Sequence, residues 1–351
     1  MRRRRVVITG ASGAVGGALL QKLSSSDIEY DLHAIASRLP PPGAVSSSAQ
    51  WHRVDLGDPG AVTRLQRMFA KVRCVVHLAW PAQSTRNARV LDAVGVGGTY
   101  AVLIAAHVAD VSQLVYLSSA AAYAPAQGQR VDESWSTAGV PTSAYSQAKS
   151  AAEALLDDYD RKGDGLPITR LRPAFIVGRR AAPGIRRGAF PAYFPPGLLN
   201  LLPLLPVHTG LQVPVVHVDD VADACLNAIE RRAFGAFNLA AEPPLRPNDI
   251  ARTFGALALP IPPRLLRPLA MAAWRARLQP IDPGWLDVIT SMPLLDTARA
   301  RMKLSWQPRH TSLEAMEDLA RSLTARTGTR PSVLTGGSLA GGVRRRFSGD
   351  E

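Results

Sequence analysis

The sequence is poor in cysteine and has no unbroken apolar run long enough to cross a bilayer. Its two cysteines, Cys74 and Cys225, cannot form a disulfide framework, and we expect both to be buried thiols in a reducing compartment. The longest apolar candidate, residues 190–206, is interrupted by prolines. The apolar run near the N-terminus stops at Thr9–Gly13, too early for a signal peptide. We therefore expect a cytoplasmic protein that is neither exported nor embedded in a membrane.

Lysine is also scarce, with five lysines against thirty-six arginines, although the net charge is +13. Most of the excess positive charge lies at the two ends, in residues 2–5 and 321–351. A charge run is usually a solvated face, and no aromatic residues are interleaved with the arginines as in nucleic-acid-binding motifs. We therefore do not expect nucleic acid to be the main partner. The seven histidines show no metal-ligand spacing, so no metal is expected either.

What the chain does have is an ordinary globular composition, with 46% hydrophobic and 20% charged residues over 351 positions. This excludes a disordered or fibrous protein and allows one large domain with a lobe. In the first half, short β-rich runs alternate with helical patterns. We expect strands at 5–9, 32–36, 51–54, 74–78, 114–117 and 168–171, and helices at 15–23, 91–109 and 144–159.

This alternation predicts an α/β protein with a doubly wound parallel sheet, the Rossmann fold, and a smaller C-terminal substrate lobe. We assign residues 1–172 and about 215–240 to the dinucleotide-binding domain. Residues 173–214 and 241–325 form the predicted lobe, and the composition of residues 179–214 favours loops. Residues 326–351 are rich in Gly, Ser, Thr and Arg and are predicted to be a disordered basic tail.

A glycine turn follows the first strand and opens the first helix. Gly10, Gly13 and Gly16 are spaced by three residues. The first glycine permits a tight turn, the second lets backbone N–H groups approach a pyrophosphate, and the third allows close packing of helix on strand. The N-terminus of the helix adds partial positive charge. The predicted cofactor-binding residues of this turn are Gly10, Ser12, Gly13, Ala14, Val15 and Gly16.

The end of the second strand predicts which dinucleotide binds. A carboxylate there would bind the ribose 2′-hydroxyl of NAD, whereas an arginine accommodates the 2′-phosphate of NADP. The strand ends in Ser37 and Arg38, with no acidic residue. We therefore prefer NADP as the cofactor, with NAD as the alternative.

Tyr145 and Lys149 lie four residues apart and so share one face of a helix. A tyrosine is a poor acid–base catalyst at neutral pH unless nearby positive charge favours its phenolate, and Lys149 supplies such a charge. Ser119 ends the fifth strand, where a doubly wound sheet binds its ligands, and its hydroxyl could hold a substrate oxygen. Ser119, Tyr145 and Lys149 are the predicted catalytic residues.

These motifs, in order, resemble the extended short-chain dehydrogenases/reductases, the NAD-dependent epimerase/dehydratase family. The resemblance covers about residues 5–325. It is carried by the glycine turn, Asp55-Leu56, His77-Leu78-Ala79, Leu117-Ser118-Ser119 with Tyr123, Tyr145-x-x-x-Lys149, Leu171-Arg172-Pro173, the run from Val216 to Ala222, and the stretches 296–301 and 304–308.

The resemblance implies that Asp55 and Leu56 bind adenine, that Leu78, Ala79 and Pro173 line the cofactor, and that Lys149 reaches its ribose. It also implies a homodimer. His217 to Asp220 are expected to brace the joint between lobe and domain.

The chain departs from the family pattern in two places. Gly95 stands where members usually carry asparagine, and the segment after Pro173 lacks the asparagine that commonly contacts nucleotide-sugar phosphates. Arginines could still receive phosphates there, at positions 179, 180, 186 and 187. The apolar, proline-bent segment 190–205 suits an apolar pocket, or simply packs the lobe on the sheet. The helix expected at 264–277 has leucines and a basic face; we interpret it as a lobe helix, with a membrane-surface helix as the alternative.

Three hypotheses follow. The first is an NADP- or NAD-dependent oxidoreductase that acts on the carbonyl or alcohol of a fairly apolar small-molecule substrate. The second is a sugar-nucleotide epimerase or dehydratase that recycles its NAD internally. The third is a non-catalytic member that senses dinucleotides or binds nucleic acid, and the presence of Ser119, Tyr145 and Lys149 argues against it.

Overall fold

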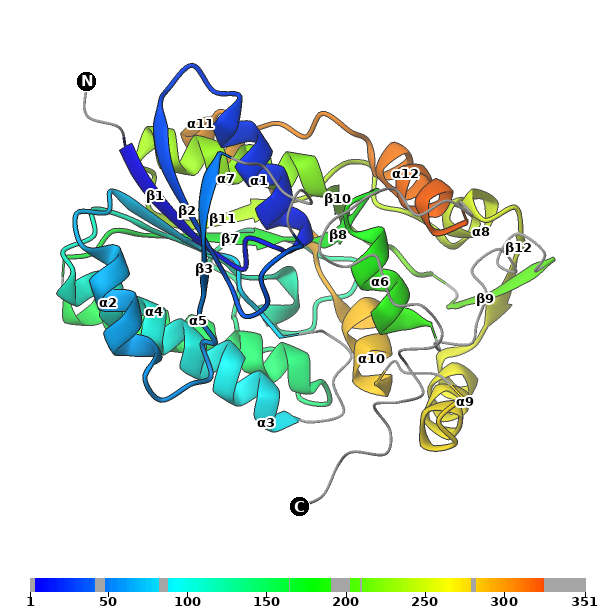
Figure 1. The fold of residues 1–351 in the computed structure, drawn as a ribbon. Coiled ribbons are helices and arrows are strands. Elements are labelled where there is room, and N and C mark those ends of the chain that lie inside the picture. Colours follow the sequence, from blue (N-terminus) through cyan, green and yellow to red (C-terminus); the bar gives the residue numbers. More distant parts are fainter. Residues whose placement is uncertain are drawn as a thin grey trace.

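The computed structural model describes residues 4–41, 48–81, 88–163, 165–190, 203–208, 210–278 and 282–324 (Figure 1). The basic tail predicted at 326–351 and most of the apolar segment 190–205 lie outside these residues.

A seven-stranded sheet with parallel strand pairs forms the centre of the larger domain. Its strand order is β11-β7-β5-β4-β1-β2-β3. The bounds are β1 (Arg4–Thr9), β2 (Tyr30–Ala36), β3 (Ala49–Arg53), β4 (Cys74–His77), β5 (Leu114–Leu117), β7 (Ile168–Pro173) and β11 (Gly235–Leu239). The order reverses between β1 and β4, the switch point at which such sheets bind ligands. The prediction of a doubly wound α/β fold is therefore confirmed.

Helices cover both faces of this sheet (Figure 1). One layer contains α1 (Ala14–Ser24), α7 (Val218–Arg231) and α11 (Ala298–Leu304), and the other contains α2 (Ala61–Phe69), α4 (Gly97–Val108) and α5 (Ala144–Lys162). In β1, Val6 and Ile8 join the core on the first side and Val7 joins the core on the second. A strand that is buried on both faces is apolar at successive positions, which is why β1 has an apolar run.

Helix α4 is preceded by α3 (Ala88–Val90) and by a π-helical turn, η1 (Leu91–Val96). Together they fill the range in which the sequence predicts one helix. Within the described residues, the stretch Leu91–Val108 is long and apolar enough to cross a membrane, and half of it is buried inside the protein. Asp92 and several glycines interrupt this stretch, so residues 190–206, and not this stretch, stand out in the sequence as the longest apolar candidate.

The described part of the smaller lobe has two short parallel strand pairs with helices around them. Strand β8 (Phe175–Val177) pairs with β10 (Val215–His217), and β9 (Leu204–His208) pairs with β12 (Leu257–Ile261). The helices are α6 (Ala182–Ala189), α8 (Pro247–Thr253), α9 (Pro263–Arg275), α10 (Pro283–Ser291) and α12 (Ser312–Thr324). The segment 179–214 is therefore less dominated by loops than its sequence suggests. The domain boundaries drawn from the sequence stay predictions.

Three small elements complete the described structure. The 3₁₀ turn η2 (Ala120–Ala122) follows β5, and β6 (Arg130–Val131) pairs with β13 (Leu294–Leu295). The β6–β13 pair joins the segment after β5 to a segment that follows α10.

Candidate active site

The glycine turn between β1 and α1 has the geometry of a phosphate cradle. Gly10 has a positive φ of 70°, and a Cβ there would lie 2.5 Å from the backbone nitrogen of Ala79. A Cβ at Gly16 would lie 2.6 Å from the Gly10 carbonyl oxygen. At Gly13 an added Cβ would meet the Gly10 oxygen at 3.1 Å and otherwise face open space. The glycines therefore keep the turn tight at its two ends and leave room at its middle.

The charge at this turn suits an anion. The first turn of α1 contains no acidic residue, so the partial positive charge of the helix N-terminus is not neutralised there. Val15 is buried, while Ser12 and Ala14 are partly exposed beside the turn. The backbone nitrogen of Ala11 donates to the carbonyl of Ile35 at 3.2 Å, which holds the turn against the end of β2. These residues fit the diphosphate of a dinucleotide.

The other predicted cofactor residues lie at the same edge of the sheet. Ser37 and Arg38 follow β2 and are exposed. Asp55 follows β3, and its carboxylate accepts from the Gly57 backbone nitrogen at 2.9 Å. Leu56 beside it is buried. The residues predicted to select NAD or NADP, after β2, and those predicted to bind adenine, after β3, therefore lie at the ends of neighbouring strands.

Leu78, Ala79 and Pro173 occupy the ends of two further strands. The backbone nitrogen of Leu78 donates to the carbonyl of Thr9 at 3.1 Å, so β4 ends against the glycine turn. Ala79 is the residue that Gly10 approaches most closely. Pro173 is buried at the end of β7. Leu78 and Ala79 therefore adjoin the glycine turn, whereas Pro173 lies two strand positions away from β4.

Tyr145 and Lys149 lie on one buried face of α5, as their spacing predicts. Tyr145 is 6% exposed and Lys149 is 2% exposed. The Lys149 ammonium donates to the carbonyl oxygen of Leu117 at 3.0 Å, and lies 3.5 Å from the hydroxyl oxygen of Tyr116. Leu117 ends β5, two residues before Ser119. The lysine therefore joins the helix that carries Tyr145 to the strand that leads to Ser119.

Ser119 begins the turn η2 and is partly exposed. Its hydroxyl oxygen accepts from the Ala121 backbone nitrogen at 3.1 Å. The hydroxyl of Ser146, next to Tyr145, donates to the Ala121 carbonyl at 2.5 Å. The start of α5 is thus fixed to the turn that carries Ser119. Sequence reasoning did not single out Ser146, because serine near a helix start is common as a cap.

Burial in this site disfavours the charged forms of its basic side chains. It lowers the pKa of Lys149 to about 7, and Glu153, one turn further along α5, partly opposes that shift. His77, under the end of β4, has its pKa lowered to about 3 by burial and by the charge of Lys149, so it is neutral. Its ring lies 2.7 Å from the Thr9 hydroxyl and 3.1 Å from the Thr99 hydroxyl. His77 therefore braces β1 and α4.

A buried ion pair anchors α5 to β7. Both carboxylate oxygens of Glu153 accept from Arg172 at 2.9 Å, and Arg170 also approaches this carboxylate. Burial alone would raise the pKa of Glu153, but the Arg172 guanidinium holds it below its usual range. Tyr123 accepts from Arg172 and donates to Asn238 at 2.7 Å, which extends the network to β11. Arg172 and Tyr123, singled out by resemblance, are therefore parts of the scaffold behind the site.

Two tryptophans that sequence reasoning missed surround Tyr145. The ring centroid of Trp285, from α10 of the lobe, lies 4.5 Å from the ring centroid of Tyr145. The ring centroid of Trp80, which follows β4, lies 6.2 Å from it. Phe175 packs edge-on against Trp285 at 5.8 Å. Lone tryptophans carry no pattern that a sequence reader could use. The immediate surroundings of the tyrosine ring are therefore aromatic and apolar.

His217, Asp220 and His310 come close enough together to be compared with a metal site. Each group already has a partner: His217 accepts from the Asp219 backbone nitrogen, and the Asp220 carboxylate accepts from the backbone nitrogens of Arg309 and His310. The two histidine rings stack at 3.9 Å. These contacts join α7 to the segment before α12. The sequence spacing could not show that the two histidines would meet.

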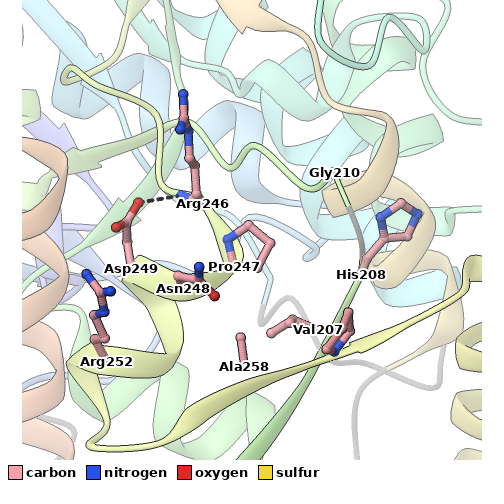
Figure 2. A pocket seen from close by; sticks show the side chains of 10 residues that line it. Val207, His208, Gly210, Arg246, Pro247, Asn248, Asp249, Arg252 and Ala258 are labelled. Carbon is pink, nitrogen blue, oxygen red and sulfur yellow. Dashed lines mark hydrogen bonds between the residues drawn. The ribbon is translucent and has the colours of Figure 1, made fainter.

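A pocket of about 480 Å³ lies in the lobe between β9, α8 and β12 (Figure 2). Its lining residues are Val207, His208, Gly210, Arg246, Pro247, Asn248, Asp249, Arg252, Ala258 and Pro260, and do not include the predicted catalytic residues. Asp249 accepts from the Arg246 backbone nitrogen at 2.9 Å, and the Arg246 side chain extends away from Ala258. Asp249 thereby caps the start of α8, and we assign this pocket no chemistry.

Comparison with known proteins identifies the family of this chain. The model of the NAD dependent epimerase/dehydratase family matches residues 6–240. A decarboxylating sterol-4-alpha-carboxylate 3-dehydrogenase of Saccharomyces cerevisiae is 30% identical over 194 residues, which are 52% of this chain and 55% of the yeast protein. The chain therefore spans about half the length of that relative.

The fold is shared with solved sugar-nucleotide epimerases. A UDP-glucose 4-epimerase of Thermus thermophilus, in complex with NAD, is 22% identical and covers 92% of this chain and 100% of its own, with a TM-score of 0.68. A UDP-glucuronic acid 4-epimerase of Bacillus cereus, also in complex with NAD, is 18% identical, covers 91% and 98%, and has a TM-score of 0.66. At these identities the likeness extends to the fold alone.

Proposed function

Because this chain belongs to the NAD-dependent epimerase/dehydratase family and is an NAD-dependent enzyme of that family, we propose that it is an oxidoreductase acting on the carbonyl or alcohol of a fairly apolar small molecule. One observation carries this proposal. The Lys149 ammonium donates to the Leu117 carbonyl, and so joins the helix that carries Tyr145 to the strand that leads to Ser119. This is the set of groups that proton transfer to or from a substrate oxygen requires.

Each residue has a distinct role in the proposed reaction. When bound, the dinucleotide supplies or accepts the hydride. Tyr145 donates a proton to the substrate oxygen in reduction and removes it in oxidation. Lys149 holds positive charge near the phenol, which favours the phenolate, and its Nζ is a donor for ribose hydroxyls. Ser119 donates a hydrogen bond to the same substrate oxygen and so fixes its position.

The surroundings of Tyr145 favour an apolar substrate. Trp80 and Trp285 lie against its ring, and Phe175 lies behind Trp285. Arg179 and Arg180, which could receive the phosphates of a sugar nucleotide, are close to the carboxylates of Asp318 and Asp219. The yeast relative is named for a sterol carboxylate, an apolar substrate class. These observations support the oxidoreductase above the sugar-nucleotide epimerase.

We also propose a preference for NADP(H). The support is local: Arg38 is exposed just after β2, the strand end that adjoins the glycine turn, and no carboxylate lies between Ile35 and Arg38. An arginine in this position can neutralise a 2′-phosphate, which NAD lacks.

The test is a fluorescence titration of purified protein with NADPH and with NADH, after measuring the cofactor that remains bound through purification. Exchangeable dinucleotide, turnover with apolar ketones or alcohols, and a loss of about a hundredfold or more in kcat for Tyr145→Phe are expected. Undiminished turnover in Tyr145→Phe would contradict the catalytic assignment. Tightly retained NAD, with no net change in its redox state during turnover of a sugar nucleotide, would favour the epimerase instead.

A further inference from the structure

Trp80 is a feature of the site that the proposed reaction does not yet use. It follows β4 directly after the His77-Leu78-Ala79 run, and its side chain reaches the π-helical turn η1. A Cβ at Gly95 would lie 3.0 Å from Cη2 and 3.0 Å from Cζ2 of the indole. Any larger side chain at position 95 would therefore have to displace the ring. Gly95, which stands where the family pattern has asparagine, provides the space that the indole fills.

The same indole covers Lys149. The Lys149 Nζ lies 3.5 Å from the centroid of the Trp80 ring, closer than its 5.1 Å separation from the Tyr116 ring. A cation over the face of tryptophan is attracted by the negative charge of the ring face, and more strongly where water is excluded. The ammonium is therefore held between the indole on one side and the Leu117 carbonyl on the other.

The charged and titratable groups around Lys149 are paired with other groups or neutral, which makes the contact of its ammonium with Trp80 important. On α5, Glu153 is already bonded to Arg172 through both oxygens, and Tyr145 lies one turn back. On β4, His77 is neutral, since burial and then Lys149 lower its pKa to about 3. On β5, burial keeps the pKa of Tyr116 well above its usual value, so its hydroxyl is neutral too. Arg170 on β7 also approaches Glu153 rather than the lysine. The close partners of the ammonium are thus a carbonyl, a hydroxyl and an indole face.

We propose that Trp80, packed against Gly95, is a positioning residue that holds the Lys149 ammonium charged and in place beside Tyr145. This inference rests on the proposed function for its meaning in catalysis. The contact itself is a property of the chain and can be tested without cofactor or substrate.

The scarcity of lysine makes a direct measurement practical. The chain has only Lys22, Lys71, Lys149, Lys162 and Lys303, so protein labelled with ¹³C at the lysine ε-carbon gives few signals. Lys149→Met assigns the signal of Lys149. Its shift, followed against pH in cofactor-free protein, reports the pKa of the ammonium.

Three variants separate a role in holding charge from a role in filling space. Trp80→Leu keeps an apolar side chain but removes the aromatic face, and is expected to lower the pKa of Lys149 by about one unit. Trp80→Phe retains an aromatic face and is expected to restore at least half of that shift. Trp51→Leu is the matched control, because Trp51 on β3 is also a partly buried tryptophan whose indole nitrogen is buried without a partner, and it should leave the pKa unchanged. An unchanged or raised pKa in Trp80→Leu overturns the proposal.

A double-mutant cycle tests the packing of Trp80 against Gly95. Gly95→Asn should displace the indole and lower kcat, with the alkaline limb of its pH profile moved toward neutrality. Adding Trp80→Ala empties the space and should recover part of the loss, because the asparagine amide oxygen can then accept from Lys149. Strictly additive losses would contradict the pairing. Should Trp80→Leu fail to fold, Gly95→Asn and Trp80→Phe still give the ¹³C readout.

The outcomes distinguish this proposal from the proposed function. If the protein binds no dinucleotide but Trp80→Leu shifts the pKa of Lys149, the contact is correct and the proposed function is wrong. If Trp80→Leu binds NADPH more tightly and leaves the pKa unmoved, the indole blocks the lysine instead of supporting it, and the proposal is wrong while the proposed function stands.

Discussion

Lys149 carries positive charge in a place where burial opposes it. Burial lowers its folded-state pKa to about 7, from an ordinary value of 10.5. Between these two values the unfolded chain holds a proton that the folded chain has lost, so stability should rise with pH across this window. Below pH 7 both states are protonated and the folded state bears the full cost. The lysine that we propose for catalysis is therefore expected to destabilise the fold at neutral pH and below.

Replacing this lysine should stabilise the protein. Lys149→Met is expected to raise the free energy of unfolding at pH 6, by about 2.5 kcal/mol more than at pH 9, because the cost of the buried charge falls as pH rises above the folded-state pKa. Urea unfolding at the two pH values measures both differences. Lys162→Met, at the exposed end of α5, is the control and should change stability by no more than about 0.5 kcal/mol. A gain that grows with pH would show that the sign is wrong.

Arg38 should decide the choice of dinucleotide. Its guanidinium is exposed at the end of β2, where the 2′-phosphate of NADP would lie in a doubly wound fold. Arg38→Ala is expected to raise the Kd for NADPH about tenfold or more and to leave the Kd for NADH within about twofold. Arg67→Ala, an exposed arginine of α2, controls for a general loss of positive charge. Equal effects on NADPH and NADH would refute a specific contact with the phosphate.

At the scale of elements, one ion pair governs how α5 lies on the sheet. Glu153 is fully buried and bonded to Arg172 of β7 through both oxygens. Glu153→Gln would leave a buried guanidinium without its charge partner, and is expected to cost about 3 kcal/mol of unfolding free energy. Glu317→Gln, which breaks an exposed pair with Arg321, should cost less than about 1 kcal/mol. Urea unfolding of the two variants gives the comparison, and similar losses would mean that burial does not matter here.

The elements of the larger domain could be predicted from sequence because their signals are local. Apolar runs marked β1, β4 and β5, with a glycine directly after β1 and a serine directly after β5, and helical spacing marked α1 and α5. The lobe strands could not be found in this way. Strands β9 and β12 are five residues long and contain Pro206 and Pro260, which indicate loops to a sequence reader, although proline is tolerated at the edge of a two-stranded pair.

The residues of the candidate site also differ in whether a local sequence pattern could predict them. Tyr145, Lys149 and the glycine turn are linked by short spacings and could be predicted. Trp80 and Trp285 come to Tyr145 from segments more than sixty residues before it and more than a hundred residues after it, and no local rule connects them. The absence of asparagine at Gly95 looked like a loss in the sequence. In the structure, the missing side chain is the space that Trp80 occupies.

At the scale of the whole molecule, the lobe directly contacts α5 and the residues before it. A Cβ at Gly284 of α10 would lie 2.6 Å from the Thr142 carbonyl, and Trp285 stacks on Tyr145. Asp287 of the same helix accepts from the Thr142 hydroxyl and from Arg267 of α9. The position of α10 is therefore coupled to the position of the Tyr145 ring.

The outer surface of η1, α4 and α5 carries exposed small and apolar side chains. Helices α4 and α5 lie side by side (Figure 1). Along η1 and α4, residues at helical spacing face outward and are small or apolar: Ala93, Gly97, Tyr100, Ile104 and Val108. Tyr100 is 50% exposed and Val108 is 62% exposed. On α5, Ala151 and Ala154 are exposed as well. Small residues let helices of two copies approach closely, and the half of Leu91–Val108 that is not buried in one chain belongs to this surface.

We propose that this surface forms the homodimer that the family resemblance implies. A charge in its middle should then prevent association, because an unpaired buried charge is costly. Tyr100→Glu is expected to convert a dimer of about 75 kDa to a monomer at micromolar concentration, as measured by size-exclusion chromatography with light scattering. Leu257→Glu places the same charge at another exposed apolar position, in the lobe, and should leave the dimer intact. A monomeric wild type, or dissociation by Leu257→Glu alone, would show that α4 and α5 do not form the interface.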